Sequence, residues 1–275
     1  GGSNDGEWFI RRSSDNGESW DQQKIIDNSE GHVYQFIRQN PLNPDHLVLI
    51  GNHKDTKTRP YSWRRIYAWE SRDGGLSFQK LCNQKSIALP AKRSDLEMVY
   101  ADATHQLFVT GFAIAENGKP LILAAHKNDP EHEIVAISWQ QDHWEMNQVC
   151  TSTNWPGSAT YKENVWRPSG GDVNPRDCNE ITIAAAVNNI HEIQRWHSTD
   201  NGISWKKTAD ITSNSVVKNF RPIYIDNGHP LDWNTLWHSG EFYGTTASPL
   251  HGRHFDRFDD VILLNELLTQ TRKQH

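Results

Sequence analysis

Apolar and polar positions alternate over short stretches of the chain, as at 8–12 and 193–197, and turn-forming residues separate these stretches. Alternation with a period of two predicts β-strands with one buried face. The predicted strands fall into sets of four, so the sequence predicts an all-β protein. The three complete sets are expected at 33–38, 47–52, 65–70 and 78–81; at 106–113, 121–126, 134–139 and 144–149; and at 164–167, 181–187, 192–197 and 205–209.

Three eight-residue segments share the pattern S-x-D-x-G-x-S-aromatic, at 13–20, 71–78 and 198–205. The pattern suits a structural hairpin turn, because Asp and Ser side chains bond the turn backbone and Gly supplies a positive φ. The first two octads start 58 residues apart and the next pair 127 apart, so we expect a further unit between them, with 137–144 as a degenerate copy. A period of about 60 residues suits the four-stranded, antiparallel blade of a β-propeller.

These octads resemble the Asp-box (BNR) repeats of sialidase-like β-propellers. The order of segments 196–205, 211–215, 219–222 and 236–240 further resembles BNR-repeat polysaccharide lyases of the ulvan-lyase kind. In those lyases an Asp box leads into a run of the form T-x-x-S…N…R-P…W-x-x-G. The resemblance implies a propeller that cleaves a uronic-acid-containing polysaccharide by β-elimination.

We expect a single β-propeller domain over 1–275, either short or part of a larger propeller. Blades are expected at 31–82, 100–150 and 160–210, with partial blades at 1–28 and 218–250 that close on each other. Apolar residues between 261 and 268 recur at helical spacing, which predicts a short amphipathic C-terminal helix at 256–272. This helix would pack against the propeller or bind a partner.

Composition narrows the classes of partner. Lys and Arg total 28 against 34 Asp and Glu, a net charge of -6, and the two signs are interspersed, which argues against nucleic acid as a partner. No apolar run approaches the roughly 20 residues that span a bilayer, so membrane insertion is excluded. The chain shows no signal peptide, and we expect a secreted or periplasmic protein. The 12 Trp, 7 Tyr and 9 Phe favour aromatic-lined sites in a chain whose mean hydropathy is only -0.76.

The candidate site lies on the blade face opposite the octads. Successive strands are antiparallel, so the start of the first strand and the end of the second reach the same face. In two blades these positions hold histidines with the same spacing of 21 residues, namely His32 with His53 and His105 with His126. The pairs suit proton transfer or, alternatively, metal ligation by neutral imidazole. Without an HExxH motif we expect no cofactor, although a structural metal ion is left open.

A polysaccharide lyase must neutralise a uronate carboxylate, remove the adjacent proton and protonate the leaving oxygen. The resemblance implies His and Tyr for proton transfer and Arg for the carboxylate. The catalytic candidates are His32, His53, His105, His126, Tyr100 and Tyr161. The substrate-binding candidates are Arg167, Arg221, Lys162, Asn164, Asn219, Trp166, Trp237 and His238.

Two other functions stay open. A sialidase-like glycoside hydrolase needs three arginines, a Tyr/Glu nucleophile pair and an Asp acid. The early F/Y-R-I-P segment typical of sialidases is missing, because the sequence at 220–222 is late and lacks the Ile. A non-catalytic propeller that binds a glycan or a protein would instead present exposed aromatic rings. In each case except protein binding, the expected partner is an anionic polysaccharide or oligosaccharide.

Overall fold

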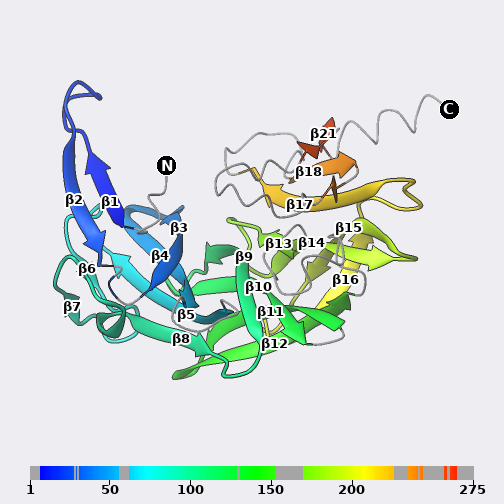
Figure 1. The fold of residues 1–275 in the computed structure, drawn as a ribbon, viewed down its shortest axis with the longest axis horizontal. Helices are drawn as coiled ribbons and strands as arrows, with labels where there is room; N and C mark the ends of the chain where they lie inside the picture. Colours follow the sequence, from blue (N-terminus) through cyan, green and yellow to red (C-terminus); the bar gives the residue numbers. More distant parts are fainter. Residues whose placement is uncertain are drawn as a thin grey trace. The chain divides into compact units, whose positions relative to one another are not determined.

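The computed structural model describes residues 7–27, 29, 31–55, 62–128, 131–152, 170–225, 235–240, 242–243, 257–258 and 261–264. In these ranges the chain is all-β, and helical structure is confined to short 3-10 turns such as Arg93–Asp95 (Figure 1). The predicted fold class is confirmed: antiparallel four-stranded sheets of the propeller type recur along the chain. The chain divides into two compact units, Gly1–Thr104 and His105–His275, and each is described by itself.

The first unit holds one large sheet and one hairpin. The sheet follows the order β3-β4-β5-β6-β7, with β8 paired to β5, so the predicted strands at 33–38, 47–52 and 65–70 are confirmed and lengthened. The strand at 97–101 and its pairing with β5 were not predicted, because the expected blades end at 82 and begin again at 100. The strands are β1 (Trp8–Arg12), β2 (Asp21–Ile26), β3 (His32–Asn40), β4 (Asn43–Asp55), β5 (Ser62–Ser71), β6 (Phe78–Gln79), β7 (Ser86–Ile87) and β8 (Glu97–Ala101).

The second unit contains two complete four-stranded meanders, ordered β12-β11-β10-β9 and β13-β14-β15-β16. The first strand of the latter meander is at Gly170–Val173, whereas the segment expected to form it, 164–167, lies outside the described residues. The remaining seven strands match the predicted positions. They are β9 (Gln106–Ile114), β10 (Pro120–Asn128), β11 (Glu131–Gln140), β12 (His143–Ser152), β14 (Glu180–Val187), β15 (Ile190–His197) and β16 (Lys206–Asp210).

The C-terminal part of the second unit corrects one expectation. The helix predicted at 256–272 is wrong for the described residues, because Arg257–Phe258 form β20 and Val261–Leu264 form β21. β21 pairs with β18 (Thr235–Gly240), which also pairs with β17 (Lys218–Tyr224). A run of four apolar residues that begins with β-branched Val and Ile suits a buried strand as well as a helix, and the open edge of β18 decides between them.

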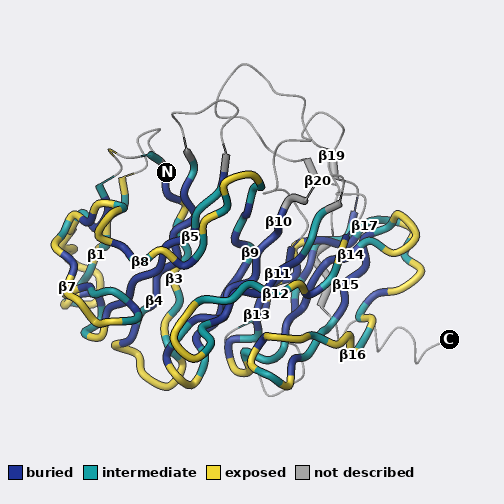
Figure 2. Tube along the Cα trace, turned by 90° about the horizontal axis from the view of Figure 1, so that it is seen from below, coloured by how far each residue is buried: buried dark blue, intermediate teal, exposed yellow. Residues whose placement is uncertain are grey.

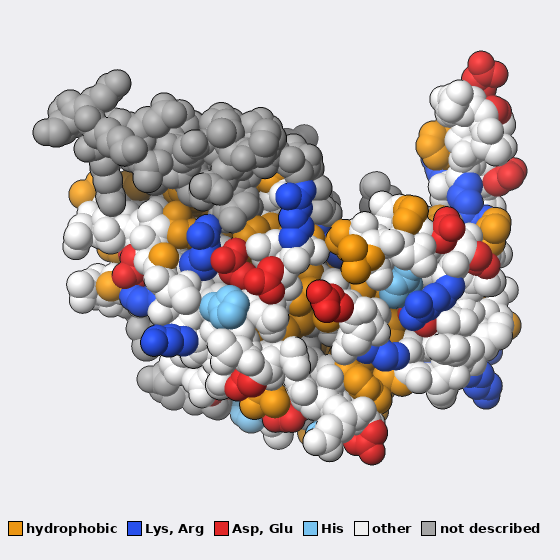
Figure 3. Space-filling model, turned by 180° about the vertical axis from the view of Figure 1, so that it is seen from behind, with side chains coloured by type: hydrophobic (Ala, Val, Ile, Leu, Met, Phe, Trp, Pro, Cys, Tyr) orange, Lys and Arg blue, Asp and Glu red, His pale blue; other side chains and the backbone are white. Residues whose placement is uncertain are grey.

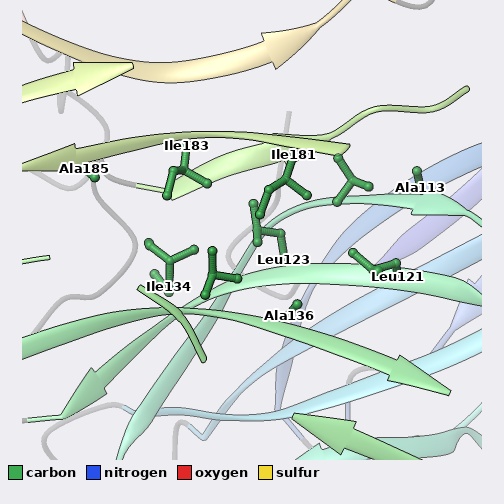
Figure 4. Close-up of a cluster of buried hydrophobic side chains, with 11 residues drawn as sticks. Ala113, Leu121, Leu123, Ile134, Ala136, Ile181, Ile183 and Ala185 are labelled. Carbon is green, nitrogen blue, oxygen red and sulfur yellow. The ribbon is translucent and has the colours of Figure 1, made fainter. Parts of the chain in front are cut away.

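The core of the second unit lies between its two meanders. Ala113, Leu121, Leu123, Ile134 and Ala136 from β9–β11 face Ile181, Ile183 and Ala185 from β14 (Figure 4). Small and branched side chains alternate, which lets the two sheets approach and interdigitate. Figure 2 shows the result along the chain: central strands are buried and the turns between them are exposed.

The three octads form turns with one shared hydrogen-bond pattern. In the third octad, the Ser198 hydroxyl accepts from the Gly202 N–H at 2.8 Å and donates to Asp200 Oδ1 at 2.8 Å. Asp200 Oδ1 also accepts from the Ser204 N–H at 2.8 Å. Residues 13–19 and 71–77 repeat these contacts. The residue types that the three octads share therefore build the turn itself, as the sequence predicts.

The octad glycine also packs on the sheet that precedes it in the chain. A Cβ at Gly202, where φ is +90°, would lie 2.8 Å from the Leu121 side chain in β10. A Cβ at Gly75, where φ is +87°, would lie 2.6 Å from the Ile10 side chain in β1. The second and third octads thus each join two successive sheets, and only glycine fits both the backbone conformation and the contact.

The degenerate octad occupies its predicted place, the turn between the third and fourth strands of the β9–β12 sheet. Gln141, with φ +49°, forms the two-residue turn with Asp142. Trp139 and Trp144 pair across the strands, with ring centroids 5.3 Å apart and planes at 75°. An aromatic cross-strand pair stabilises a hairpin by about 0.5–1 kcal/mol, so it supports this turn where the full octad is lacking.

The low pKa of the octad carboxylates predicts that the protein loses stability in acid. Hydrogen bonds from Ser204 and Ser198 lower the pKa of Asp200 to about 2, against 3.8 for an ordinary aspartate. Because the folded pKa is the lower one, the contribution is present above pH 4 and is lost as the pH falls through 2. We expect the difference in Tm between the wild type and Asp200→Asn to shrink between pH 4 and pH 2. A difference that stays constant over this range would contradict the assignment.

Candidate functional site

Two of the predicted histidines lie close together where β9 begins and β10 ends, in the β9–β12 sheet. His105 directly precedes β9, and His126 lies near the end of β10. Their rings touch edge to face, with centroids 5.4 Å apart and planes at 75°. Their positions at strand ends predict that both lie on one face of the blade, and the structure brings their rings into contact.

Glu133 completes this cluster. It lies in β11 directly opposite His126 in the strand register, and opposed residues share one face of a sheet. His126 Nδ1 lies 3.0 Å from Glu133 Oε2, and the His126 side chain is 8% exposed. A carboxylate that accepts the Nδ1–H places the ring lone pair on Nε2 and orients the imidazole. We call His105, His126 and Glu133 the histidine–glutamate cluster.

Sequence reasoning missed Glu133, although a signal was present. The predicted strands 121–126 and 134–139 form a hairpin, so the residue opposite His126 must lie at or next to the start of the second strand. An acidic residue at 133 could have been identified from this register alone.

The corresponding histidine of the first unit has a different environment. His53, near the end of β4, is 1% exposed, and its Nε2 lies 2.9 Å from the Arg93 guanidinium. Because arginine is always a donor, the His53 ring accepts this hydrogen bond and is neutral in the contact. Its ring also meets Tyr67 edge to face at 6.3 Å. Arg93 was not predicted, since it lies in the 3-10 turn between β7 and β8, outside the four-strand pattern.

Other predicted catalytic residues are placed as follows. His32 lies in β3 opposite Lys54, and its side chain is outside the described part of the structure. Tyr100 is partly exposed and lies in β8 opposite Ile66, so it belongs to the sheet of the first unit. Tyr161 lies outside the described residues, as do the substrate-binding candidates Lys162, Asn164, Trp166 and Arg167.

Arg221 is exposed, as contact with a substrate requires. It lies in β17 where the register with β18 shifts, and its φ is +50°. A non-glycine residue in the left-handed region, directly before a proline, is strained by roughly 1–3 kcal/mol.

His238, in β18, stacks on Phe220 with ring centroids 5.9 Å apart and planes at 3°.

Asn219 and Trp237 are buried in a hydrogen-bond network around Glu192, and this differs from the expected contact with a sugar. Glu192 accepts from the Ser215 N–H at 2.7 Å, from the Ser215 hydroxyl at 2.8 Å and from Thr212. The Asn219 amide also donates to Glu192 at 3.3 Å, and the Trp237 N–H donates to Asn219 at 3.2 Å. Trp237 is 1% exposed and cannot present a ring face to a ligand. These residues hold β15, β17 and β18 together.

Another buried histidine, His191, lies beside this network, and its burial predicts a pH-dependent stability. His191 is fully buried, and neither ring nitrogen has a hydrogen-bond partner in the described structure. Burial, and secondarily the charge of Lys218, lowers the pKa of His191 to about 4. In the unfolded chain the His191 ring binds a proton near pH 6.5. The free energy of unfolding is therefore unaffected by this residue above that pH, and it falls as the pH drops towards 4.

We expect His191→Leu to remove this dependence. At pH 5 the pKa difference costs the wild type about 2 kcal/mol, which the variant avoids. Urea unfolding at pH 8, 6 and 5 measures the effect, with exposed His143→Leu as the matched control. Parallel pH profiles for wild type and His191→Leu would show that His191 is not responsible.

On the face drawn in Figure 3, the acidic and basic side chains of the described residues are intermixed. Among the described residues, no helix is long and apolar enough to cross a membrane.

Comparisons with known proteins identify the fold. No family model matches the sequence, and no curated protein matches it. The structure is similar to an ulvan lyase of the PL25 polysaccharide lyases, with a TM-score of 0.65 and 13% identity, over 94% of this chain and 58% of that one. The same lyase has been solved bound to -[GlcA(1-4)Rha3S]-.

Two further structures agree with this assignment. The polysaccharide lyase Uly1 has a TM-score of 0.56 at 12% identity, over 96% of this chain and 53% of that one. The Hadza microbial sialidase Hz136 has a TM-score of 0.51 at 9% identity, over 84% and 46%. This chain therefore spans little more than half the length of the lyases it resembles. At such identities the likeness shows the fold, which is one that carbohydrate-active enzymes use.

Proposed function

We propose that this chain carries part of the active site of a polysaccharide lyase that cleaves a uronic-acid-containing polysaccharide by β-elimination. The observation that carries the proposal is the histidine–glutamate cluster, with His126 hydrogen-bonded to Glu133 at 3.0 Å and in ring contact with His105. Such an arrangement suits proton abstraction, because a carboxylate on Nδ1 orients the ring and stabilises the imidazolium that forms.

The reaction needs a base, an acid and a cation. His126 Nε2 takes the proton from C5 of the uronate, and the electron pair left behind forms the C4–C5 double bond. The bond between C4 and the glycosidic oxygen breaks, and that oxygen receives a proton from His105. No water is consumed. Arg221 or Arg167 neutralises the carboxylate, which makes the C5 proton more acidic.

The substrate class rests on separate support. One similar lyase structure is bound to -[GlcA(1-4)Rha3S]-, and the octads resemble the Asp-box repeats of sialidase-like propellers. An anionic polysaccharide is consistent with a protein that acts outside the cell. We therefore propose a secreted or periplasmic enzyme without a cofactor.

A scan of ulvan, pectate and chondroitin sulfate tests the proposal. Elimination produces an unsaturated uronate that absorbs in the near ultraviolet, and we expect this absorbance to rise on one of the polymers. New reducing ends without this absorbance would show that the chain cleaves by hydrolysis and not by elimination. Hydrolysis is the reaction expected of the sialidase-like alternative. No product with any polymer, from a folded sample, would contradict catalysis by this chain.

A further inference from the structure

An aromatic pair, Tyr34 and Trp63, lies on the sheet of the first unit and is not part of the histidine–glutamate cluster. Tyr34 in β3 lies opposite Asn52, and Lys54 in β4 lies opposite Trp63 in β5. The register with β5 shifts beside Lys54, and the contacts that both Tyr34 and Lys54 make with the Trp63 ring place the three side chains on one face of the sheet. They lie where β3 and β5 begin and β4 ends.

The two rings form a preorganised platform. Tyr34 stacks on Trp63 with centroids 4.6 Å apart and planes at 22°. Trp63 is 2% exposed, whereas Tyr34 remains 51% exposed. The inner ring therefore supports the outer one, and Tyr34 presents its surface to solvent. A tyrosine held in this way loses little conformational entropy when a ligand stacks on it.

A cation lies beside the platform. Lys54 Nζ is 5.7 Å from the centroid of the Trp63 ring, within the range of a cation–π contact. This contact keeps the ammonium group near the aromatic pair. An aromatic surface with an adjacent ammonium matches a ligand that has an apolar ring face and a negative charge.

We propose that Tyr34, Trp63 and Lys54 form a binding subsite for one acidic sugar of a polysaccharide, an inference that rests on the proposed function for its ligand class. The C–H face of the sugar stacks on Tyr34, and its carboxylate or sulfate pairs with Lys54. Trp63 is a positioning residue, because it supports the Tyr34 ring without touching the sugar. The subsite binds substrate and takes no part in proton transfer.

Binding of the three polymers to the full chain tests this subsite independently of turnover. We expect Tyr34→Ala to weaken binding of the preferred polymer about five- to tenfold, and Tyr34→Phe to change it less than twofold, because stacking requires the ring and not the hydroxyl. Affinity electrophoresis or calorimetry on the inactive His126→Gln background gives these values without cleavage of the ligand.

Lys54→Gln separates charge from stacking. This variant should weaken binding of the acidic polymer severalfold but leave binding of its carboxyl-reduced, unsulfated counterpart unchanged, whereas Tyr34→Ala should weaken both. The matched control is Ile37→Ala, which removes an exposed apolar side chain of the same strand, 55% exposed, and should alter neither.

The outcomes distinguish this inference from the proposed function. Wild-type turnover with unchanged binding in Tyr34→Ala would overturn the subsite and leave the lyase proposal intact. Weakened binding in Tyr34→Ala, with no turnover by the wild type, would support the subsite and overturn the lyase proposal. Equal losses in Tyr34→Ala and Ile37→Ala would also overturn the subsite, as would a wild type that binds none of the polymers.

Discussion

Replacing His126 with Gln should lower the rate of β-elimination by about 10²- to 10⁴-fold, the range that a general base contributes. The expected loss is in kcat, because the imidazole acts on the C5 proton in the transition state and adds little to ground-state binding. Glutamine retains the polar character of the side chain but has no titratable nitrogen. Initial rates of near-ultraviolet absorbance across a range of polymer concentrations separate kcat from KM.

Two companion variants assign the parts of the histidine–glutamate cluster. Glu133→Gln should reduce kcat by about 10- to 100-fold with KM nearly unchanged, since it removes the carboxylate that orients His126. His143→Gln is the control: this histidine lies in the same sheet, in β12, and its side chain is 61% exposed. Retention of more than a tenth of wild-type kcat by His126→Gln would rule out His126 as the base.

Removing the Glu192 carboxylate should strongly destabilise the second unit. Glu192→Ala leaves the buried donors of Thr212 and Asn219, and the half-buried donors of Ser215, without this acceptor. Each buried unsatisfied group costs about 1–3 kcal/mol, so the free energy of unfolding should fall by about 3 kcal/mol or more. A domain that is stable by 5–15 kcal/mol would lose a large share of its stability. Urea unfolding followed by tryptophan fluorescence measures the change.

Two variants check the cause of that loss. Thr212→Val removes one donor to Glu192 and should cost less than Glu192→Ala, because the other donors keep their acceptor. Glu145→Ala removes an exposed carboxylate, 38% accessible, from the same unit and should be nearly neutral. If Glu192→Ala and Glu145→Ala unfold at the same urea concentration, the network does not stabilise the fold.

Local patterns predicted the fold well because each strand and octad carries its own signal. Alternation and turn chemistry identified the sheets at 33–81 and 106–149 before any contact was known. The C-terminal helix was wrong for residues 261–264, because a short apolar run fits both periods and only the free edge of β18 selects the strand.

The candidate site was harder to predict from the sequence than the fold, because its histidines contact residues of other strands and turns. The 21-residue spacing found His105 and His126, and their contact follows from the strand ends. Glu133 depends on the hairpin register, and Arg93 on a 3-10 turn outside the repeating pattern. The same limit applies to Tyr34, which alternation marked only as one position of a strand.

The run that resembles the lyases has a structural explanation. Thr212, Ser215, Asn219 and Trp237 all belong to the Glu192 network, and Glu192 itself lies before the octad and outside the run. This part of the resemblance therefore reports how β15, β17 and β18 are joined. Evidence for the activity has to come from the histidine–glutamate cluster.

The octads have a consequence for how such proteins change over evolutionary time. Gly75 and Gly202 each pack on the sheet that comes before their own, so these two octads each carry half of a junction with the preceding sheet. A tandem duplication of one sheet together with its octad would bring a ready-made junction with it. The number of blades can then grow or shrink by whole units without a newly evolved interface, as in other repeat proteins.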